Sequence, residues 1–219
     1  MAASAEAPAG KRCQRLDPSL ARSVLSSAEA LLFDCDGVLW RGEAAVPGAA
    51  EALRLLESGS GSHRRRLLCY VTNNSSRTRE AYVEKLRRLG FPPAEPRQVF
   101  GSAFCAARFL RRALDGEADA ASVYVLGGAA LSKELESAGV RHSGCGPSPA
   151  PDSELFGARA PLEPSVRAVL VGYDEHFSYG KLCLALRYLL REERCLLVGT
   201  NRDHRLPLEG GSAVPGTKE

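Results

Sequence analysis

Two aspartates interrupt an apolar run near the start of the chain, in the sequence LLFDCDGVLW at residues 31–40. Asp34 and Asp36 are separated by one residue, and Gly37, which permits a sharp turn, follows directly. Two carboxylates this close repel each other, and the arrangement becomes favourable around a hard cation such as Mg²⁺. With a metal present, one carboxylate can attack phosphorus to form an acyl-phosphate. The other can protonate the leaving oxygen and then activate water.

A second polar group, VTNNSS at residues 71–76, follows another apolar run and precedes a helical pattern. Thr72 offers a hydroxyl group, Asn73 and Asn74 offer amides, and we expect Ser75 or Ser76 to cap the helix. Hydroxyl and amide donors at a helix N-terminus form an anion site. A phosphate monoester requires both kinds of group: carboxylates at one strand end and hydrogen-bond donors at another.

Each group also has a simpler interpretation. An Asp-x-Asp-Gly sequence is often only a turn, and Asn-Asn-Ser-Ser is often only a helix cap, so the pair is a stronger indication than either half. A calcium loop is excluded because Val38, Leu39 and Ala45 occupy positions where such a loop needs other residues. Cys35 is a weak candidate nucleophile, because no histidine lies near it in the sequence.

Strand-like and helix-like segments alternate along the chain, which predicts an α/β fold with parallel sheet. We expect strands at 31–35, 67–74, 98–103, 122–128, 166–174 and 194–201, and helices at 47–57, 76–89, 104–114 and 178–190. The segment 141–165, rich in Pro, Gly, Ser and Ala, is expected to be a surface loop. Ligands of such sheets bind beyond the carboxyl ends of the strands, where both polar groups lie.

Composition excludes several classes of protein. The net charge of +3 over 219 residues is too small to indicate nucleic acid or membrane as a partner. The seven cysteines form no CxxC pair, which is typical of reduced thiols in a cytoplasmic protein. No uncharged apolar run approaches the ~20 residues that a membrane span needs, and the N-terminus lacks the apolar region of a secretory signal.

The segments LLFDCDGVLWRGEAAVPGAAEAL and VTNNSSRTREAYVEKLRRLGF resemble the first and second motifs of haloacid-dehalogenase-type phosphatases. The segments APLEPSVRAVLVGYDEHFSYGKL and CLLVGTNRDHRLPLEGG are similar to the cap of the members that hydrolyse phosphoglycolate or glycerol-3-phosphate. Members that hydrolyse pyridoxal phosphate are near relatives, and pyridoxal phosphate is the alternative substrate. The resemblance extends from about Cys13 to Thr217.

The resemblance implies a Rossmann-like core with an inserted α/β cap domain. The expected divisions are a disordered tail at 1–27, the first part of the core at 28–104, the cap at 105–209 and a return toward the core at 210–219. It also implies a small phosphorylated metabolite as substrate and a homodimer formed through the cap.

The resemblance further assigns roles to single residues. Asp34 would be the nucleophile and a Mg²⁺ ligand, and Asp36 the acid and base, with its backbone oxygen on the metal. Thr72, Asn73 and Asn74 would hold the phosphoryl group, and His176 in the loop GYDEHFSY would contact the rest of the substrate. Arg77 is as consistent with a surface residue as with a charge near the site.

The sequence departs from the family pattern in one respect. The family has two later motifs, a lysine in a GKPS-like context and an aspartate in a GDRLxTDI-like context, and this sequence contains neither. We therefore expect an incomplete core, either in a truncated chain or in a short isoform, with weak Mg²⁺ binding and negligible turnover. A non-catalytic fragment is the alternative. The first strand would then lie at an exposed edge.

Overall fold

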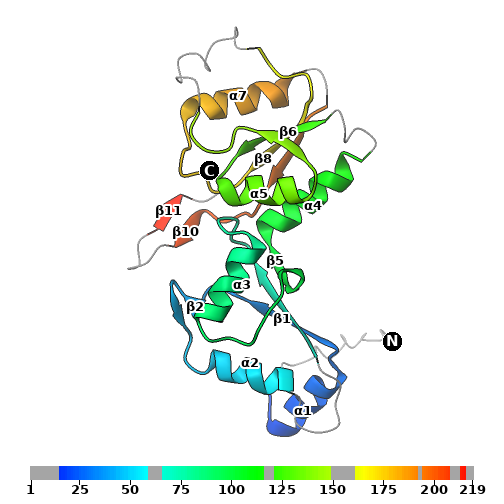
Figure 1. Cartoon of the computed structure of the whole chain (residues 1–219), viewed down its shortest axis with the longest axis vertical. Helices are drawn as coiled ribbons and strands as arrows, with labels where there is room; N and C mark the ends of the chain where they lie inside the picture. Colours follow the sequence, from blue (N-terminus) through cyan, green and yellow to red (C-terminus); the bar gives the residue numbers. More distant parts are fainter. Residues whose placement is uncertain are drawn as a thin grey trace, which may run out of the picture.

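The computed structural model describes residues 15–58, 66–115, 121–148, 161–191, 194–207 and 213–215. Within them the chain forms two parallel sheets, each with its own helices, and two short antiparallel pairs of strands. The two sheets lie one above the other along the longest axis of the molecule (Figure 1). This arrangement confirms the predicted α/β class.

The lower sheet has the strand order β1-β4-β5. Its strands are β1 (Ala30–Asp34), β4 (Leu67–Thr72) and β5 (Val99–Gly101), and β2 (Trp40–Arg41) and β3 (Ala44–Ala45) form a small hairpin beside it. Helices α2 (Ala49–Ser58) and α3 (Arg79–Arg88) and the short η1 (Pro96–Gln98) complete this part. Leu53, Tyr82 and Leu86 of the helices cover one face of the sheet, against Leu68 and Tyr70.

The other face of the lower sheet is open among the described residues. Residues alternate between the two faces of a strand, so Leu31 and Phe33 contact the covered core while Ala30, Leu32 and Asp34 share the open face. Leu32 is 68% exposed, and β1 is one of the two edge strands of this sheet within the described residues. The expected exposed edge is therefore present.

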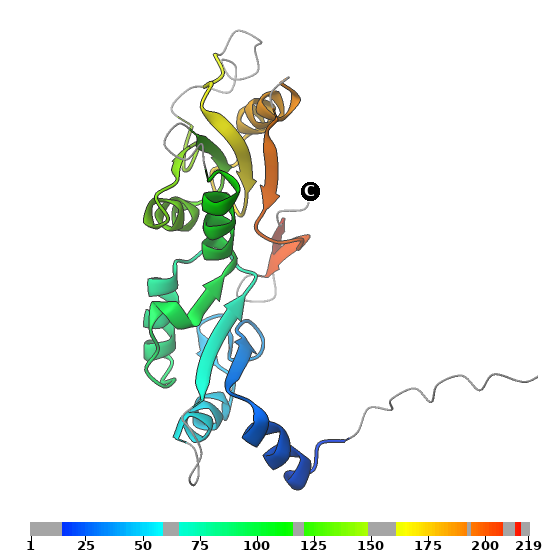
Figure 2. The same cartoon turned by 90° about the vertical axis from the view of Figure 1, so that its right-hand side faces the viewer.

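The upper sheet has the strand order β7-β6-β8-β9. Its strands are β6 (Ser122–Leu126), β7 (Arg141–Ser143), β8 (Val166–Val171) and β9 (Leu196–Gly199), and its helices are α4 (Ser102–Ala113), α5 (Ala129–Ser137) and α7 (Tyr179–Leu190). Helices α4 and α5 pack against Val123 and Val125, whereas α7 packs against Tyr124 and Leu126. The sheet is covered on both faces (Figure 2), and every residue of β6 is buried.

The strands of both sheets point toward the junction between them (Figure 2). Gly172, just past the end of β8, is packed so closely that a Cβ placed on it would lie 3.2 Å from the Ser75 hydroxyl oxygen. Thr200, just past β9, donates a hydrogen bond to the same oxygen, 3.3 Å away. The carboxyl ends of the two sheets therefore face each other, and their polar loops meet.

The structure corrects three expectations. Within the expected tail, Pro18–Ser27 forms helix α1, because the Asp17 side chain accepts hydrogen bonds from the backbone of Ser19 and Leu20. The apolar residues Leu20 and Val24 repeat at helical spacing, but no residue of this helix is buried. Within the expected loop 141–165, Arg141–Ser143 forms strand β7, which is too short for a clear alternating pattern. Residues 1–14 and 149–160 lie outside the described residues.

The third correction concerns the segment after β9. Strands β10 (Arg205–Pro207) and β11 (Ala213–Pro215) pair antiparallel there, and the sequence did not indicate them. Most of the expected return at 210–219 lies outside the described residues. The boundary expected at 104/105 falls inside α4, whose buried face from Ala103 onward packs on the upper sheet. The division into core and cap at that residue stays a prediction.

Candidate active site

A tight turn after β1 positions the Asp36 carboxylate. Gly37 has a φ of +83°, a conformation that glycine adopts without strain, and its amide donates to the Trp40 carbonyl at 2.7 Å. This turn brings Trp40 back over Asp36, and the indole Nε1 donates to Asp36 Oδ1 at 2.9 Å. Trp40 is fully buried and stacks on Tyr82 with 6.2 Å between ring centroids. The donor is therefore fixed by the core.

Thr72 holds the second oxygen of the same carboxylate. Its hydroxyl group donates to Asp36 Oδ2 at 3.2 Å and accepts from the Asn74 amide, also at 3.2 Å. The parallel register pairs Asp34 with Val71, so the ends of β1 and β4 lie side by side. The structure thus brings two of the predicted site residues, Asp36 and Thr72, into direct contact.

Asp34 ends β1 on the open face of the sheet, and both aspartates are exposed to solvent. Cys35 between them turns to the other face and is completely buried. Burial, together with the charges of Asp36 and Asp34, raises the pKa of the Cys35 thiol to about 12. The thiol therefore stays protonated at neutral pH, which agrees with the rejection of Cys35 as a nucleophile.

The two asparagines are engaged by other groups. The Asn73 side-chain amide donates to the Asp203 carboxylate, and the Asn73 carbonyl accepts from Ser102 Oγ at 2.7 Å and from Asn201 Nδ2 at 2.9 Å. The Asn74 side-chain oxygen accepts from the backbone amide of Ser76 at 2.8 Å. Asn73 is thus held by the upper part of the chain, and Asn74 stabilises its own loop.

The helix cap differs from the expectation. Helix α3 begins at Arg79, and its cap is Thr78, whose side chain accepts from the Ala81 amide at 3.3 Å. Neither Ser75 nor Ser76 caps it. Two further residues, Arg77 and Thr78, separate the polar loop from the helix. Ser75, Ser76 and Thr78 are all favourable N-cap residues, so the sequence alone does not identify which of them caps the helix.

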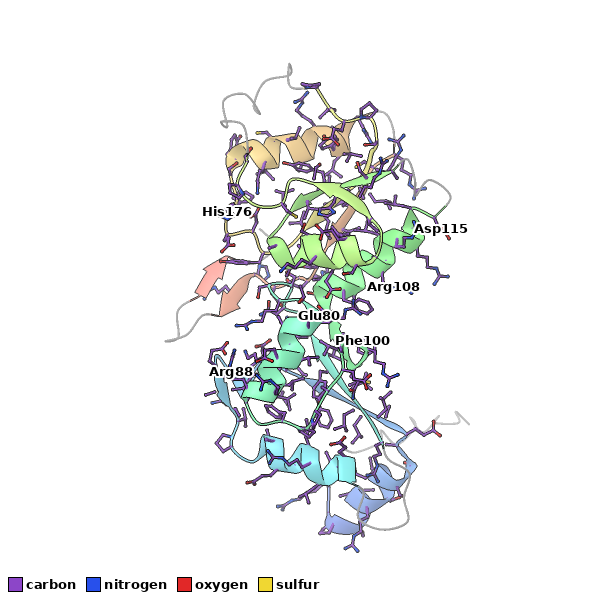
Figure 3. All side chains as sticks on the ribbon, viewed as in Figure 1. Glu80, Arg88, Phe100, Arg108, Asp115 and His176 are labelled. Carbon is purple, nitrogen blue, oxygen red and sulfur yellow. The ribbon has the colours of Figure 1, made fainter. Side chains whose placement is uncertain are left out.

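His176 and Arg77 are both placed on exposed segments. His176 lies in the loop between β8 and α7 on the upper sheet (Figure 3), its side chain is 43% exposed, and its ring Nε2 lies 3.8 Å from the Glu175 carboxylate. Arg77 donates to Glu43 at 2.8 Å, and Glu43 also pairs with Arg88. Hydrogen bonds join neither side chain to Asp36 or Thr72 among the described residues.

Sequence reasoning missed the residues that orient the site. Trp40 lies four residues after Asp36 and three after Gly37, and this spacing is a sequence signal that its indole can reach back to the carboxylate. Ser102, Asn201 and Asp203 reach Asn73 from α4 and from the segment after β9. No local sequence pattern links these segments, because the contacts span 29 to 130 residues.

The oxygen donors present suit a hard cation. Two exposed carboxylates lie at one strand end, and Mg²⁺ is commonly held by one or two carboxylates together with water and substrate phosphates. A group of three His, Cys, Asp or Glu side chains able to hold a metal does not occur in the described part of the chain. Asp34 and Asp36 therefore fit a magnesium site that leaves positions for water and phosphate.

Comparison with known proteins gives consistent results. Residues 31–141 match the family model of haloacid dehalogenase-like hydrolases. The chain is 67% identical to glycerol-3-phosphate phosphatase of Gallus gallus over 96% of its own length and 65% of the relative. It is 48% identical to human chronophin over 94% of its length and 64% of the relative. The chain thus spans about two thirds of the length of these curated relatives.

Solved structures show the same fold. A glycerol phosphate phosphatase from Mycobacterium tuberculosis in complex with magnesium superposes with a TM-score of 0.65 at 28% identity, covering 89% of this chain and 50% of that one. The same mycobacterial enzyme has also been solved with calcium. Sequence and fold agree, and the chain belongs to the haloacid dehalogenase-like hydrolases.

Proposed function

We propose that this chain provides the nucleophile, the acid/base group and the cap of a Mg²⁺-dependent phosphatase for small phosphate monoesters. The observation that carries the proposal is the Asp36 carboxylate, held by Trp40 at 2.9 Å and by Thr72 at 3.2 Å beside the free end of β1. A side chain oriented by two donors of the protein is suited to transfer a proton at a defined place. Asp34, which has an exposed carboxylate, is suited to attack.

The reaction has two steps. Asp34 attacks the phosphorus atom and the bond from phosphorus to the alcohol oxygen breaks, while Asp36, in its carboxylic acid form, gives its proton to that oxygen, so an alcohol leaves and an aspartyl-phosphate forms. Asp36 then takes a proton from water, whose oxygen attacks the phosphorus and releases inorganic phosphate. The sum is ester plus water giving alcohol plus phosphate, with both aspartates restored.

Mg²⁺ would be held by the Asp34 carboxylate and the Asp36 backbone oxygen. The bound ion would supply positive charge that lets an anionic nucleophile approach an anionic ester. Thr72, Asn73 and Asn74 would hold the phosphoryl group. The Asn73 side-chain amide has a second N–H besides the one that it donates to Asp203. The Thr72 hydroxyl has a single proton, which would have to turn from Asp36 Oδ2 to a phosphate oxygen.

We propose glycerol-3-phosphate or phosphoglycolate as the substrate, with His176 contacting the part of the molecule beyond the phosphate. The proposal is supported by the 67% identity to a protein named glycerol-3-phosphate phosphatase. Pyridoxal phosphate is the alternative. A non-catalytic role is the second candidate function.

One experiment separates these candidates. The chain, and a chimera that continues it with the remaining part of the chicken relative, are assayed with Mg²⁺ on glycerol-3-phosphate, phosphoglycolate and pyridoxal phosphate. Beryllofluoride, or labelled phosphate from the substrate, is used to trap Asp34. We expect the chimera to hydrolyse the first two esters and to be labelled at Asp34, and the chain alone to be far slower.

The matched control is a second exposed carboxylate. Asp115 lies at the far end of α4 (Figure 3), away from the strand ends that carry the site. Asp34→Asn should abolish labelling and hydrolysis in the chimera, whereas Asp115→Asn should leave both unchanged. Equal activity of the Asp34→Asn variant and the wild type would refute the assignment of the nucleophile.

The homodimer through the cap stays a prediction. It is supported by a row of exposed leucines along α7, namely Leu182, Leu186 and Leu190, which repeat every four residues and share one helix face. Leu186→Glu should convert a dimer into a monomer in sedimentation velocity, and an unchanged sedimentation coefficient would argue against this surface.

The cytoplasmic location also stays a prediction. The six cysteines in the described part of the chain are free thiols, which supports a reducing compartment. Among the described residues, every helix is too short or too polar to pass through a lipid bilayer.

A further inference from the structure

An ion pair lies buried in the loop that carries His176. Lys181 Nζ donates to Asp174 Oδ2 at 2.7 Å, and each side chain is only 2% exposed. Asp174 stands in the loop after β8, and Lys181 stands in the first turn of α7. The proposed reaction uses neither residue.

The second oxygen of the same carboxylate holds the tip of the loop. Asp174 Oδ1 accepts the backbone amide of His176 at 2.9 Å, and the Asp174 carbonyl accepts the amide of Phe177 at 3.2 Å. One buried carboxylate therefore connects the ammonium group on α7 with the backbone from which the His176 ring extends. The ring itself lies on an exposed part of the loop (Figure 3).

Both ends of this loop are also fixed. At its start, a Cβ on Gly172 would lie 2.6 Å from Leu131 Cδ1 and 3.2 Å from Ser75 Oγ, so the backbone there touches the polar loop of the lower sheet. At its end, Ser178 Oγ accepts the amide of Lys181 at 3.2 Å. Between these anchors, Asp174 accepts the backbone amides of His176 and Phe177.

Net stability is a poor explanation for this pair. Removing two charges from water costs about as much free energy as their attraction returns, so apolar residues of similar size are often equally stable in such a position. What a buried pair with defined hydrogen bonds provides is one geometry. Here that geometry is the orientation of the His176 backbone.

We propose that Asp174 and Lys181 are positioning residues that fix the direction in which His176 faces the substrate, and that they thereby set the choice among phosphate esters. The assignment of His176 as the substrate contact rests on the proposed function. The clamp on the His176 amide rests on the geometry alone.

The first test does not depend on activity. Amide hydrogen exchange at His176 is followed by NMR in the 219-residue chain, its Lys181→Met variant and the double variant Asp174→Leu/Lys181→Met. The single variant leaves a buried carboxylate without its cation and is expected to lower Tm. The double variant buries no lone charge, so it should keep Tm near that of the wild type.

In the double variant we expect the His176 amide to exchange about 10- to 100-fold faster, the factor that corresponds to one lost hydrogen bond to a charged group. Amides within β8 and α7 should keep their rates. Glu134→Gln, which alters a different buried ion pair, is the control and should leave His176 exchange unchanged. Unchanged exchange at His176 in a folded double variant would overturn the clamp.

The second test measures selectivity in the chimera. In the double variant we expect KM for glycerol-3-phosphate to rise about tenfold with a smaller change in kcat, while inhibition by inorganic phosphate stays constant, because phosphate alone does not reach the cap loop. The single variant Lys181→Arg retains the positive charge. Its ratio of kcat/KM between the esters should therefore lie closer to that of the wild type than the ratio of the double variant does.

The outcomes are distinguishable. An unaltered ratio of kcat/KM between esters, combined with faster His176 exchange, would overturn the role in selectivity. Absence of hydrolysis by the wild-type chimera would refute the proposed function instead, and the exchange result would still decide whether the clamp exists.

Discussion

The two sheets contain similar apolar strands in different surroundings. In the upper sheet, β6 has helices on both faces and all of its residues are buried. In the lower sheet, the described helices cover one face of β1, and alternate residues of this strand are exposed. A continuous apolar run is typical of a strand buried on both faces. The comparison shows that the run predicts a strand, whereas the neighbouring elements determine whether both of its faces are buried.

The sheets also differ in the roles that their loops are proposed to have. The lower sheet carries both carboxylates at a solvent-exposed strand end, and the upper sheet presents a histidine from a loop held by a buried ion pair. The reactive carboxylates of the lower sheet are therefore accessible to solvent, whereas the ion pair that supports the histidine loop of the upper sheet is buried.

The largest expected effect is on a core residue of the upper sheet. Leu170 in β8 is completely buried, so Leu170→Ala should lower the free energy of unfolding by about 2–5 kcal/mol. Leu32→Ala on the open face of β1 should change it by less than about 0.5 kcal/mol. Denaturation in urea measures both, and similar losses for the two variants would contradict the comparison.

A smaller effect is expected where the sheets are joined by charge. Glu134 in α5 is buried and accepts the backbone amide of Arg79 at 2.9 Å and its Nε at 3.1 Å. Glu134→Gln should cost about 1.5–3 kcal/mol, the range for hydrogen bonds to a charged group. Urea denaturation provides the value, and an unchanged midpoint would show that this contact does not connect the two parts energetically.

Close packing at the junction can be tested at Gly172. A methyl group there would lie 2.6 Å from Leu131 Cδ1, and Leu131 is itself buried, so it has little room to move. Gly172→Ala should cost about 1–3 kcal/mol. Gly139→Ala is an informative reference, because its Cβ would meet no atom within 4 Å, but its φ of +68° adds strain. Heat denaturation of both separates crowding from backbone strain.

The smallest effect concerns one buried tyrosine in each sheet. Burial raises the pKa of Tyr70 to about 12 and also raises the pKa of Tyr124. Because the unfolded chain releases these protons near pH 10, stability is fully present below that pH and is lost as the pH rises. At pH 11, ionisation of Tyr70 in the unfolded chain should lower the free energy of unfolding by about 1.4 kcal/mol relative to its value well below pH 10. Tyr70→Phe should flatten the pH dependence of urea denaturation above pH 10, and an equally steep curve would contradict this.

The predictable part of the fold was the part encoded locally. Strands such as β4 and β8 and the helix α7 were indicated by runs and periodicity, and each agrees with the structure within a few residues. Helix α1, which has no buried residue, and strand β7, which spans three residues, were not predicted. The antiparallel pair of β10 and β11 was not predicted, although the Gly210-Gly211 dipeptide lies between the two strands in the sequence.

The candidate site divides in the same way. The residue types and spacing of Asp34, Asp36 and Thr72 are properties of two short segments, and the sequence alone indicated that they occupy strand ends. That Asp36 contacts Thr72 depends on the parallel register of β1 with β4, which no single segment specifies. The engagement of Asn73 by Asp203 depends on how the second sheet sits on the first.

The sequence by itself determined the kinds of chemistry available and the alternation of strands and helices, because both follow from neighbouring residues. Only the tertiary structure decided which donors orient Asp36, which face of β1 is open and how His176 is held. The physical reason is that hydrogen bonding and burial depend on distances in space, and residues such as Asn73 and Asp203 become neighbours only when both sheets have formed.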